Sequence, residues 1–233
     1  MNEAPIKAEV DWRAFSEVFD YYASGEHGAL LHDFYVWMVD QLDARDLEPA
    51  HILEMGCGTG LLAEKLVEWY PDAQFELVDK FAPMLSRARE RFEHAANVSI
   101  HEIDGESYLA SCAPEPFDLA VFCRSWYTMV DPAKAAADLV KALKPCGLAM
   151  IYDFTRTTDI ASIDERNMAD DPVRWPVCRA AMEDFNRGVG AGTYHLRSEA
   201  GMRELWSSAG AEVVAYESHE PEMPNHRLCV LKR

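Results

Sequence analysis

The stretch ILEMGCGTG, from Ile52 to Gly60, decides the fold of this chain. Its apolar beginning predicts a buried strand over His51–Met55, and Gly56, Gly58 and Gly60 predict a tight turn. The leucines that follow predict the apolar face of a helix. Because glycine has no Cβ, a turn of this kind lets the backbone approach a ligand closely.

The spacing of these glycines distinguishes two kinds of nucleotide site. A dinucleotide site follows the pattern G-x-G-x-x-G/A, and its last small residue would fall at Leu61. The observed pattern, G-x-G-x-G, instead resembles the glycine motif of the class I S-adenosylmethionine (SAM)-dependent methyltransferases. A turn that serves only tight packing is the alternative.

Strands and helices alternate after the turn, which indicates an α/β fold with a mostly parallel, doubly wound sheet. Four further strands are predicted at FELVDKF, VSIHEID, FDLAVFCRSW and GLAMIYDF. Two final strands, AEVVAYES and RLCVLKR, are joined by a segment too short for a helical crossover, so they should be antiparallel. The resemblance implies a seven-stranded sheet whose last strand is the antiparallel one.

The sequence predicts two regions. Residues 1–48 form an N-terminal helical cap, rich in aromatic residues and broken at Gly25–Gly28. Residues 49–233 form the SAM-binding domain, and a polar insertion at about 155–195 is expected to be a helical lid over the carboxyl edge of the sheet.

Composition narrows the class of partner. A formal net charge of -18 argues against nucleic acid, because phosphate binding needs a basic face. Arg87, Arg89 and Arg91 are expected on a solvated helix face. No signal peptide or membrane-spanning segment is expected. The six cysteines form no C-x-x-C pair, so we expect reduced thiols in the cytoplasm and no metal site.

The carboxyl ends of the strands should hold the cofactor, because ligands of open parallel sheets bind there. The resemblance implies that Glu54 orients the methionine part of SAM, that Asp79 accepts hydrogen bonds from the ribose hydroxyls, and that Asp104 accepts from the adenine amino group. Met84 would pack on the adenine ring. The alternatives are a core role for Met84 and a plain helix cap for Asp104. The predicted cofactor-binding set is Tyr21, Glu54, Gly56, Gly58, Asp79, Lys80, Met84, Asp104, Gly105, Glu106 and Cys123.

The acceptor side of the pocket is expected from the loop after the fourth strand, the insertion and the cap. Its predicted substrate-binding residues are Tyr22, Arg124, Trp126, Tyr127, Arg156 and Trp175. Candidates for a catalytic base are Tyr152, Asp153, Tyr194 and His195. The alternative is that most of the aromatic rings only pack the lid onto the sheet. Thr128 stands where many relatives that act on small molecules have a histidine, and no N-P-P-Y or D-P-P-Y tetrapeptide is present.

Three functions remain open at this point. The first is a SAM-dependent methyltransferase that transfers methyl in line to a small-molecule acceptor, neutral or cationic, and releases S-adenosylhomocysteine. The second is a non-methylating cyclase of the same fold, which converts SAM to azetidine-2-carboxylate and methylthioadenosine. The third is a non-catalytic SAM-binding protein. The sequence names neither the acceptor nor the atom methylated, and it leaves a homodimer open.

Overall fold

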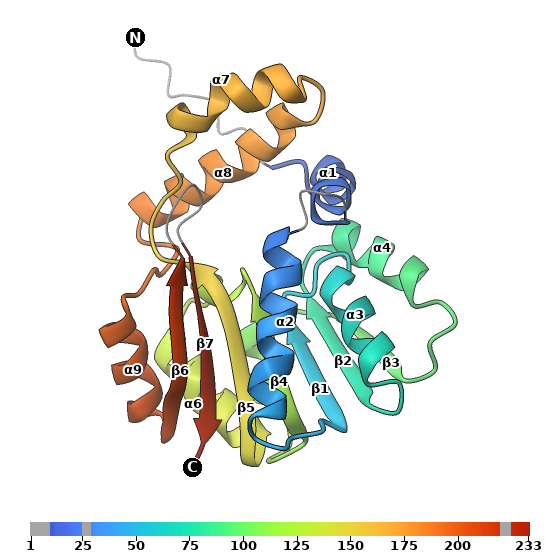
Figure 1. Cartoon of the computed structure of the whole chain (residues 1–233), viewed down its shortest axis with the longest axis vertical. Coiled ribbons are helices and arrows are strands. Elements are labelled where there is room, and N and C mark those ends of the chain that lie inside the picture. The colour runs from blue at the N-terminus through green and yellow to red at the C-terminus, as the bar shows by residue number, and fades with distance from the viewer. Residues whose placement is uncertain (1–9, 25–28, 220–224) are drawn as a thin grey trace.

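One sheet of seven strands lies at the centre of the computed structural model (Figure 1), which describes residues 10–24, 29–219 and 225–233. The strand order is β3-β2-β1-β4-β5-β7-β6. The bounds of the strands are β1 His51–Met55, β2 Gln74–Asp79, β3 Val98–Glu102, β4 Phe117–Cys123, β5 Leu143–Phe154, β6 Ala211–His219 and β7 Asn225–Lys232.

The pairing of the strands confirms the predicted sheet. β1 pairs in parallel with β2 and β4, so Ile52 lies between Phe75 and Leu119. β7 pairs antiparallel with both β5 and β6. The chain therefore has a mostly parallel α/β sheet with a reversed last strand, and the order places β1 and β4 at its middle, where the direction of winding changes.

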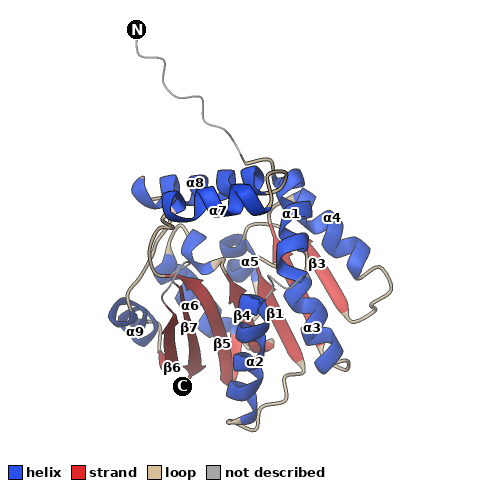
Figure 2. Cartoon of the chain, turned by 45° about the horizontal axis from the view of Figure 1, so that its top comes forward, coloured by secondary structure: helices blue, strands red, loops and turns tan. Residues whose placement is uncertain are grey.

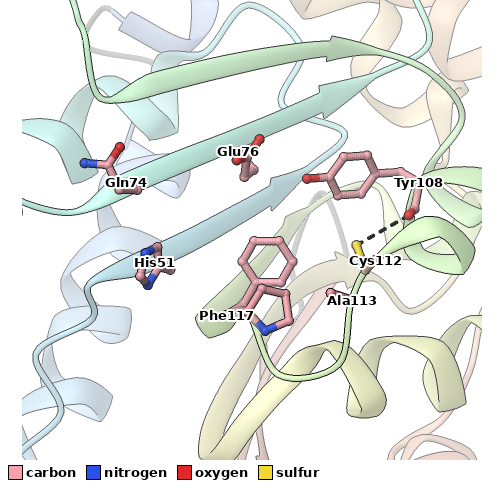
Figure 3. Close-up of a pocket in the computed structure, with 8 residues that line it drawn as sticks. His51, Gln74, Glu76, Tyr108, Cys112, Ala113 and Phe117 are labelled. Carbon is pink, nitrogen blue, oxygen red and sulfur yellow. Dashed lines mark hydrogen bonds between the residues drawn. The ribbon is translucent and has the colours of Figure 1, made fainter.

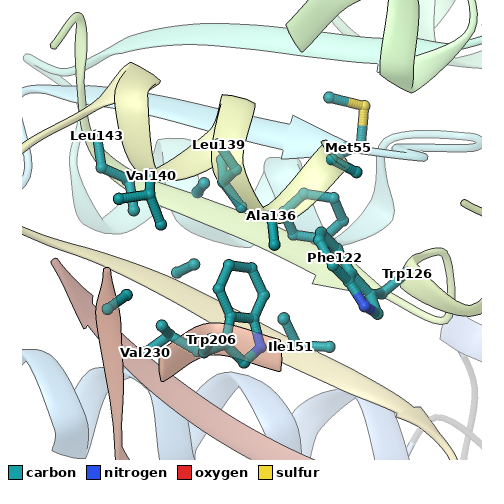
Figure 4. Packing of buried hydrophobic residues seen from close by; sticks show 14 of the residues in the cluster. Met55, Phe122, Trp126, Ala136, Leu139, Val140, Leu143, Ile151, Trp206 and Val230 are labelled. Atoms are coloured by element: carbon teal, nitrogen blue, oxygen red, sulfur yellow. The ribbon is translucent and has the colours of Figure 1, made fainter. Parts of the chain in front are cut away.

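Helices cover both faces of the sheet because each face is apolar. α2, α3 and α4 bury their apolar residues against one face, and α5, α6 and α9 bury theirs against the other. The bounds are α2 Ala29–Asp43, α3 Leu61–Trp69, α4 Ala82–Arg91, α5 Gly105–Ser111, α6 Pro132–Ala142 and α9 Glu199–Ser208. On the second face Trp126 and Trp206 pack together, with ring centroids 4.8 Å apart (Figure 4).

Three more helices lie beyond the carboxyl edge of the parallel strands (Figures 1 and 2). They are α1 Trp12–Ser24, α7 Ile160–Asp170 and α8 Trp175–Gly190. The last two fall within the predicted insertion at 155–195, and α1 contacts both α8 and α4. The predicted break at Gly25–Gly28 lies outside the described residues.

Some predicted bounds were wrong. The third strand was expected to reach Asp104 and ends at Glu102, because Asp104 begins a short helix, α5, that the sequence did not indicate. The fourth strand was expected to run through Trp126 and ends at Cys123. It ends there because Arg124 has a left-handed backbone, with φ of 55°, and a short 3-10 helix, η2, follows at Trp126–Thr128.

No helix in the described ranges is long and apolar enough to cross a bilayer.

Candidate functional site

The glycine turn joins β1 to α3 at the carboxyl edge of the sheet. Gly56, Gly58 and Gly60 are all left-handed, with φ of 71°, 55° and 78°. A Cβ on Gly56 would lie 2.4 Å from the Cβ of Ser125, closer than two carbon atoms can approach. The Gly56 N–H donates to the Val78 carbonyl oxygen at 2.7 Å, which ties the turn to β2. Glycine is thus required at position 56 both by the backbone and by the neighbouring loop.

Glu54 lies near the end of β1 with its side chain only 2% exposed. Burial raises the pKa of this carboxyl group to about 8, although a hydrogen bond from the Ala63 backbone opposes the shift. No described residue forms a hydrogen bond with its Oε2 atom. A buried acceptor left without a donor costs about 1–3 kcal/mol, so this oxygen fits a donor supplied by a ligand, such as an ammonium group.

Asp79 ends β2, the neighbouring strand. Its Oδ2 accepts the Gly58 N–H at 2.9 Å, and its Oδ1 accepts the Phe81 N–H at 2.9 Å. Burial raises the pKa of Asp79, and these two hydrogen bonds oppose the rise. Since each carboxylate oxygen can accept two hydrogen bonds, the group keeps acceptor capacity for two hydroxyls. Asp79 therefore fixes the glycine turn and is itself oriented by it, as a ribose-binding carboxylate would need.

Met84 and Lys80 lie on either side of Phe81, at the start of α4. Met84 is buried, and its Cε atom lies 3.1 Å from the place that a Cβ on Gly58 would take. Its thioether thus packs on the glycine turn, and contact with adenine stays a prediction. Lys80 is exposed, with Nζ 5.2 Å from the centroid of the Phe81 ring.

Asp104, Gly105 and Glu106 lie at the start of α5. Asp104 caps the helix by accepting the Ser107 N–H at 2.9 Å, and hydrogen bonds from Ser107 lower its pKa. The cap that the sequence offered as an alternative is therefore present, and an adenine contact stays a prediction. The Glu106 carboxylate accepts two backbone N–H groups, from residues 130 and 131, at 3.0 and 2.8 Å. It holds the loop before α6.

The ends of β4 and β5 lie side by side, with Cys123 paired with Tyr152. Burial raises the pKa of Cys123 to about 12, so the thiol is neutral. The Arg124 N–H donates to the Tyr152 carbonyl oxygen at 2.6 Å. The guanidinium carbon of Arg124 lies 5.4 Å from the Tyr152 ring centroid and 5.3 Å from the Phe154 ring centroid. Neither the Tyr152 hydroxyl nor Arg124 Nε has a hydrogen-bond partner in the described part of the chain.

Asp153 is the next residue of β5 and is 3% exposed. Its Oδ2 accepts the Tyr127 N–H at 2.7 Å, and its Oδ1 accepts the Phe154 N–H at 3.0 Å. Burial raises the pKa of Asp153 to about 7, against the opposing charge of Arg124. Such a carboxyl group can take up or release a proton near neutral pH.

A cluster of aromatic rings joins η2 and β5 to the lid. The Tyr127 ring lies 5.1 Å from Phe185 and 5.0 Å from Tyr194, and Phe154 lies 4.5 Å from Phe185, all between centroids. The His195 N–H donates to the Tyr127 carbonyl oxygen at 2.9 Å. The rings thus pack the lid onto the sheet, as the alternative interpretation expected of them. Substrate contact by Tyr127, Tyr194 or His195 stays a prediction.

Both tryptophans of the predicted substrate-binding set are buried against other side chains of the protein. Trp126 is 2% exposed and packs between Phe122 and Trp206 in the core. Trp175 is 4% exposed, and its Nε1 donates to an Asp164 oxygen at 2.7 Å inside the lid. The structure therefore gives both rings a packing role.

Tyr21 and Tyr22 lie where the cap meets the lid. The Arg174 guanidinium lies 3.7 Å from the centroid of the Tyr21 ring, and the Tyr22 hydroxyl donates to Asp171 at 3.1 Å. Both tyrosines thus connect α1 to the start of α8. Arg156 is exposed.

The contacts that hold α1 over the site were not predicted from the sequence. Asp20 binds Arg87 Nε at 2.8 Å and Arg91 Nη2 at 3.3 Å. Arg91 Nε also donates to the Thr59 carbonyl oxygen in the glycine turn, at 3.0 Å. The expectation of a solvated arginine face was wrong for Arg91, which is only 19% exposed because α1 covers it. The helical cap is thereby connected to the glycine turn through Arg91.

Of two cavities in the described structure, one lies away from this cluster of residues and the other borders it at Tyr152. One, of about 210 Å³, lies at the amino ends of β1 and β2, between His51, Gln74, Tyr108 and Cys112 (Figure 3). The other, of about 100 Å³, lies between the start of α2 and the β6–β7 pair, and Tyr152 lines it.

Comparison with known proteins agrees with this geometry. A family model described as a methyltransferase domain matches residues 52–147, which span β1 to the beginning of β5. The malonyl-[acyl-carrier protein] O-methyltransferase of Acetivibrio thermocellus is 29% identical over 121 residues, covering 52% of this chain and 41% of that protein. The trans-aconitate 2-methyltransferase of Rhodopseudomonas palustris strain HaA2 is 28% identical over 161 residues, covering 68% of this chain and 60% of that protein.

The fold also matches solved structures. The magnesium protoporphyrin IX methyltransferase of Synechocystis, crystallised with S-adenosylhomocysteine, superposes with a TM-score of 0.62. The match covers 94% of each chain at 13% sequence identity, so it speaks for the fold alone. The chain spans less than two thirds of the length of the malonyl and trans-aconitate methyltransferases that it matches, and the family match covers residues 52–147.

Proposed function

Because the chain belongs to the class I S-adenosylmethionine-dependent methyltransferases, we propose that it transfers the methyl group of SAM to a small-molecule acceptor. The names of the two curated relatives, both methyltransferases, favour methyl transfer over cyclisation of SAM. The net charge of -18 favours a small acceptor over nucleic acid.

The observation that carries this proposal is the group of polar atoms at the ends of β1 and β2. Glu54 offers a buried oxygen that lacks a donor among the described residues, beside a left-handed glycine turn. Asp79, oriented by that turn, offers two oxygens with spare acceptor capacity. An amino acid part and a ribose ring, joined as they are in SAM, would use both carboxyl groups.

The protein's contribution to methyl transfer is mainly geometric. SAM supplies an electrophilic methyl carbon, so the chain must hold the acceptor in line with it and exclude water. We assign the exclusion of water to α1, α7 and α8, which lie beyond the carboxyl edge. For an acceptor that loses a proton, Asp153 is the base we favour, because its pKa of about 7 suits proton exchange at neutral pH.

We further propose the division into a cap, residues 1–48, and a cofactor-binding domain, residues 49–233. The contacts of α1 with α4 and α8 support a cap that closes over the cofactor. All six cysteines lie in the described ranges and are unpaired, which supports a reducing compartment such as the cytoplasm.

Product analysis tests the reaction. The purified chain is first titrated with S-adenosylhomocysteine in a calorimeter, with Asp79→Ala as the variant expected to lose binding and NADH as the ligand expected to give no heat. The chain is then incubated with SAM and a panel of small carboxylates, amines and phenols. We expect S-adenosylhomocysteine to form with at least one of them. Methylthioadenosine formed without any acceptor would overturn the proposal, and so would an absence of binding by the wild-type chain.

A further inference from the structure

Arg124 carries a positive charge that forms no ion pair within the described chain. It follows directly after β4, and its side chain is half-buried. Arginines on α4, such as Arg87 and Arg91, form ion pairs with carboxylates. Within the described ranges, no carboxylate lies at ion-pair distance from the Arg124 guanidinium, and its Nε–H has no acceptor. A guanidinium removed from water without an anion is unfavourable, so the position calls for a partner.

Two aromatic rings compensate the charge in part. The guanidinium carbon lies over the faces of Tyr152 and Phe154, at 5.4 and 5.3 Å. The ring faces attract the cation but offer no lone pair to its N–H groups, of which an arginine has five. Against the effect of burial, the Tyr152 hydroxyl helps to raise the pKa of Arg124, but its oxygen has no hydrogen-bond partner among the described residues. The two rings therefore position the planar group and leave its hydrogen-bonding edge for something else.

Asp153 is the carboxyl group whose raised pKa the charge of Arg124 opposes, but no ion pair joins the two side chains, and both Asp153 oxygens bind backbone groups. Each accepts a backbone N–H, from Tyr127 and from Phe154, at 2.7 and 3.0 Å. These bonds hold the carboxyl group to the strand end and to η2. The arrangement resembles a base and a binding group placed side by side rather than a structural ion pair.

The backbone conformation of Arg124 is also typical of a ligand-binding position. Its φ of 55° is uncommon for a residue with a side chain, and the 2.6 Å bond from its N–H to the Tyr152 carbonyl oxygen holds it in place. Strained backbone of this kind clusters at ligand sites, because the strain persists only where the surroundings fix it.

We propose that Arg124 binds a carboxylate group of a ligand at the end of β4, through two parallel N–H···O bonds. The inference rests on the proposed function, which supplies two sources of such a group. One is the carboxylate of the methionine part of the cofactor, and the other is a carboxylate on the methyl acceptor.

The test compares Arg124→Gln and Arg124→Met with wild type by calorimetry. Arg203→Gln is the matched control, because that arginine pairs with Glu199 on the surface of α9. The first arm titrates S-adenosylhomocysteine, which has the methionine-derived carboxylate, and 5′-methylthioadenosine, which lacks it. The second arm titrates malonate and propane-1,2,3-tricarboxylate into protein saturated with S-adenosylhomocysteine. Thermal melts confirm folding, and we expect neither variant at position 124 to melt lower than wild type.

Each source predicts its own pattern. If the cofactor supplies the carboxylate, both variants weaken S-adenosylhomocysteine roughly 30-fold or more and leave 5′-methylthioadenosine unchanged. If the acceptor supplies it, both cofactor products bind as in wild type, and binding of the polycarboxylates is lost by a similar factor. Variants that bind all four compounds like wild type overturn the inference, while the cofactor site stands. Wild-type protein that binds no S-adenosylhomocysteine overturns the proposed function instead.

Discussion

Binding of the cofactor should release a proton from Glu54. In the free protein this carboxyl group is buried, and its pKa of about 8 keeps it mostly protonated at neutral pH. The ammonium group of S-adenosylhomocysteine, placed at the unpartnered Oε2, would favour the charged carboxylate. The proton must then leave to the solvent.

The size of the effect follows from that pKa. A group with a pKa of about 8 is about 0.9 protonated at pH 7 and about 0.5 protonated at pH 8. We therefore expect the release of about 0.9 protons per bound ligand at pH 7 and about 0.5 at pH 8.

Calorimetry in buffers of different ionisation enthalpy measures this number. The apparent binding enthalpy of S-adenosylhomocysteine is plotted against the ionisation enthalpy of phosphate, HEPES and Tris, and the slope gives the protons released. Asp79 also has a raised pKa, so a ligand that has the ribose but no ammonium group, 5′-methylthioadenosine, serves as the control. It should give a slope near zero.

Glu54→Gln isolates the residue further, because glutamine keeps the shape of the side chain and cannot ionise. We expect it to abolish the slope and to weaken binding. A wild-type slope of zero at both pH values refutes the role given to Glu54, as does a slope that survives in the glutamine variant.

Three further changes probe the rest of the site. Asp153 has a folded pKa above its unfolded value of 3.8, so its contribution to the free energy of unfolding should fall as pH rises from 4 to 7. In urea titrations the Asp153→Asn variant should lack about 3 kcal/mol of that fall, and a pH dependence that is the same as in wild type would contradict the raised pKa. Gly56→Ala should cost about 2 kcal/mol or more, because its Cβ would meet Ser125. Gly192→Ala, with φ of 73° and open space around it, is the control that reports the backbone cost alone, and equal costs contradict the clash. Asp20→Asn removes the anion that holds two arginines of α4, so limited proteolysis should cut α1 several-fold faster. Unchanged cleavage would show that the ion pair does not hold the cap.

The local pattern of apolar residues and glycines was enough to predict the first strand and the glycine turn. The apolar run before Gly56 and the glycines after it carry their own conformational requirements, so the strand and turn could be recognised from nine residues. Asp79 was predicted because parallel strands end at one edge, which makes the last residue of a strand a candidate wherever it lies in the chain. The antiparallel final pair followed from the length of its connection alone.

Contacts between distant segments could not be predicted in this way. Arg91 was taken for a surface residue because its partner Asp20 lies 71 residues earlier in the chain, and nothing local links them. The end of β4 was missed because Arg124 is left-handed without being glycine, a conformation that depends on its bond to β5. Trp126 was expected in the pocket because the change of chain direction at Arg124 was not foreseen. In the structure its side chain lies in the core.

The two unpartnered groups at the site bear on the nature of the acceptor. Glu54 fits an ammonium group and Arg124 fits a carboxylate, and the methionine part of SAM carries both. If the cofactor occupies both residues, Asp153 and the aromatic rings remain for the acceptor, an environment that suits a neutral or cationic molecule. If Arg124 remains unpaired after the cofactor has bound, the acceptor must itself bring the negative charge. The response of S-adenosylhomocysteine binding to Arg124→Gln therefore decides the charge of the acceptor before the acceptor is known.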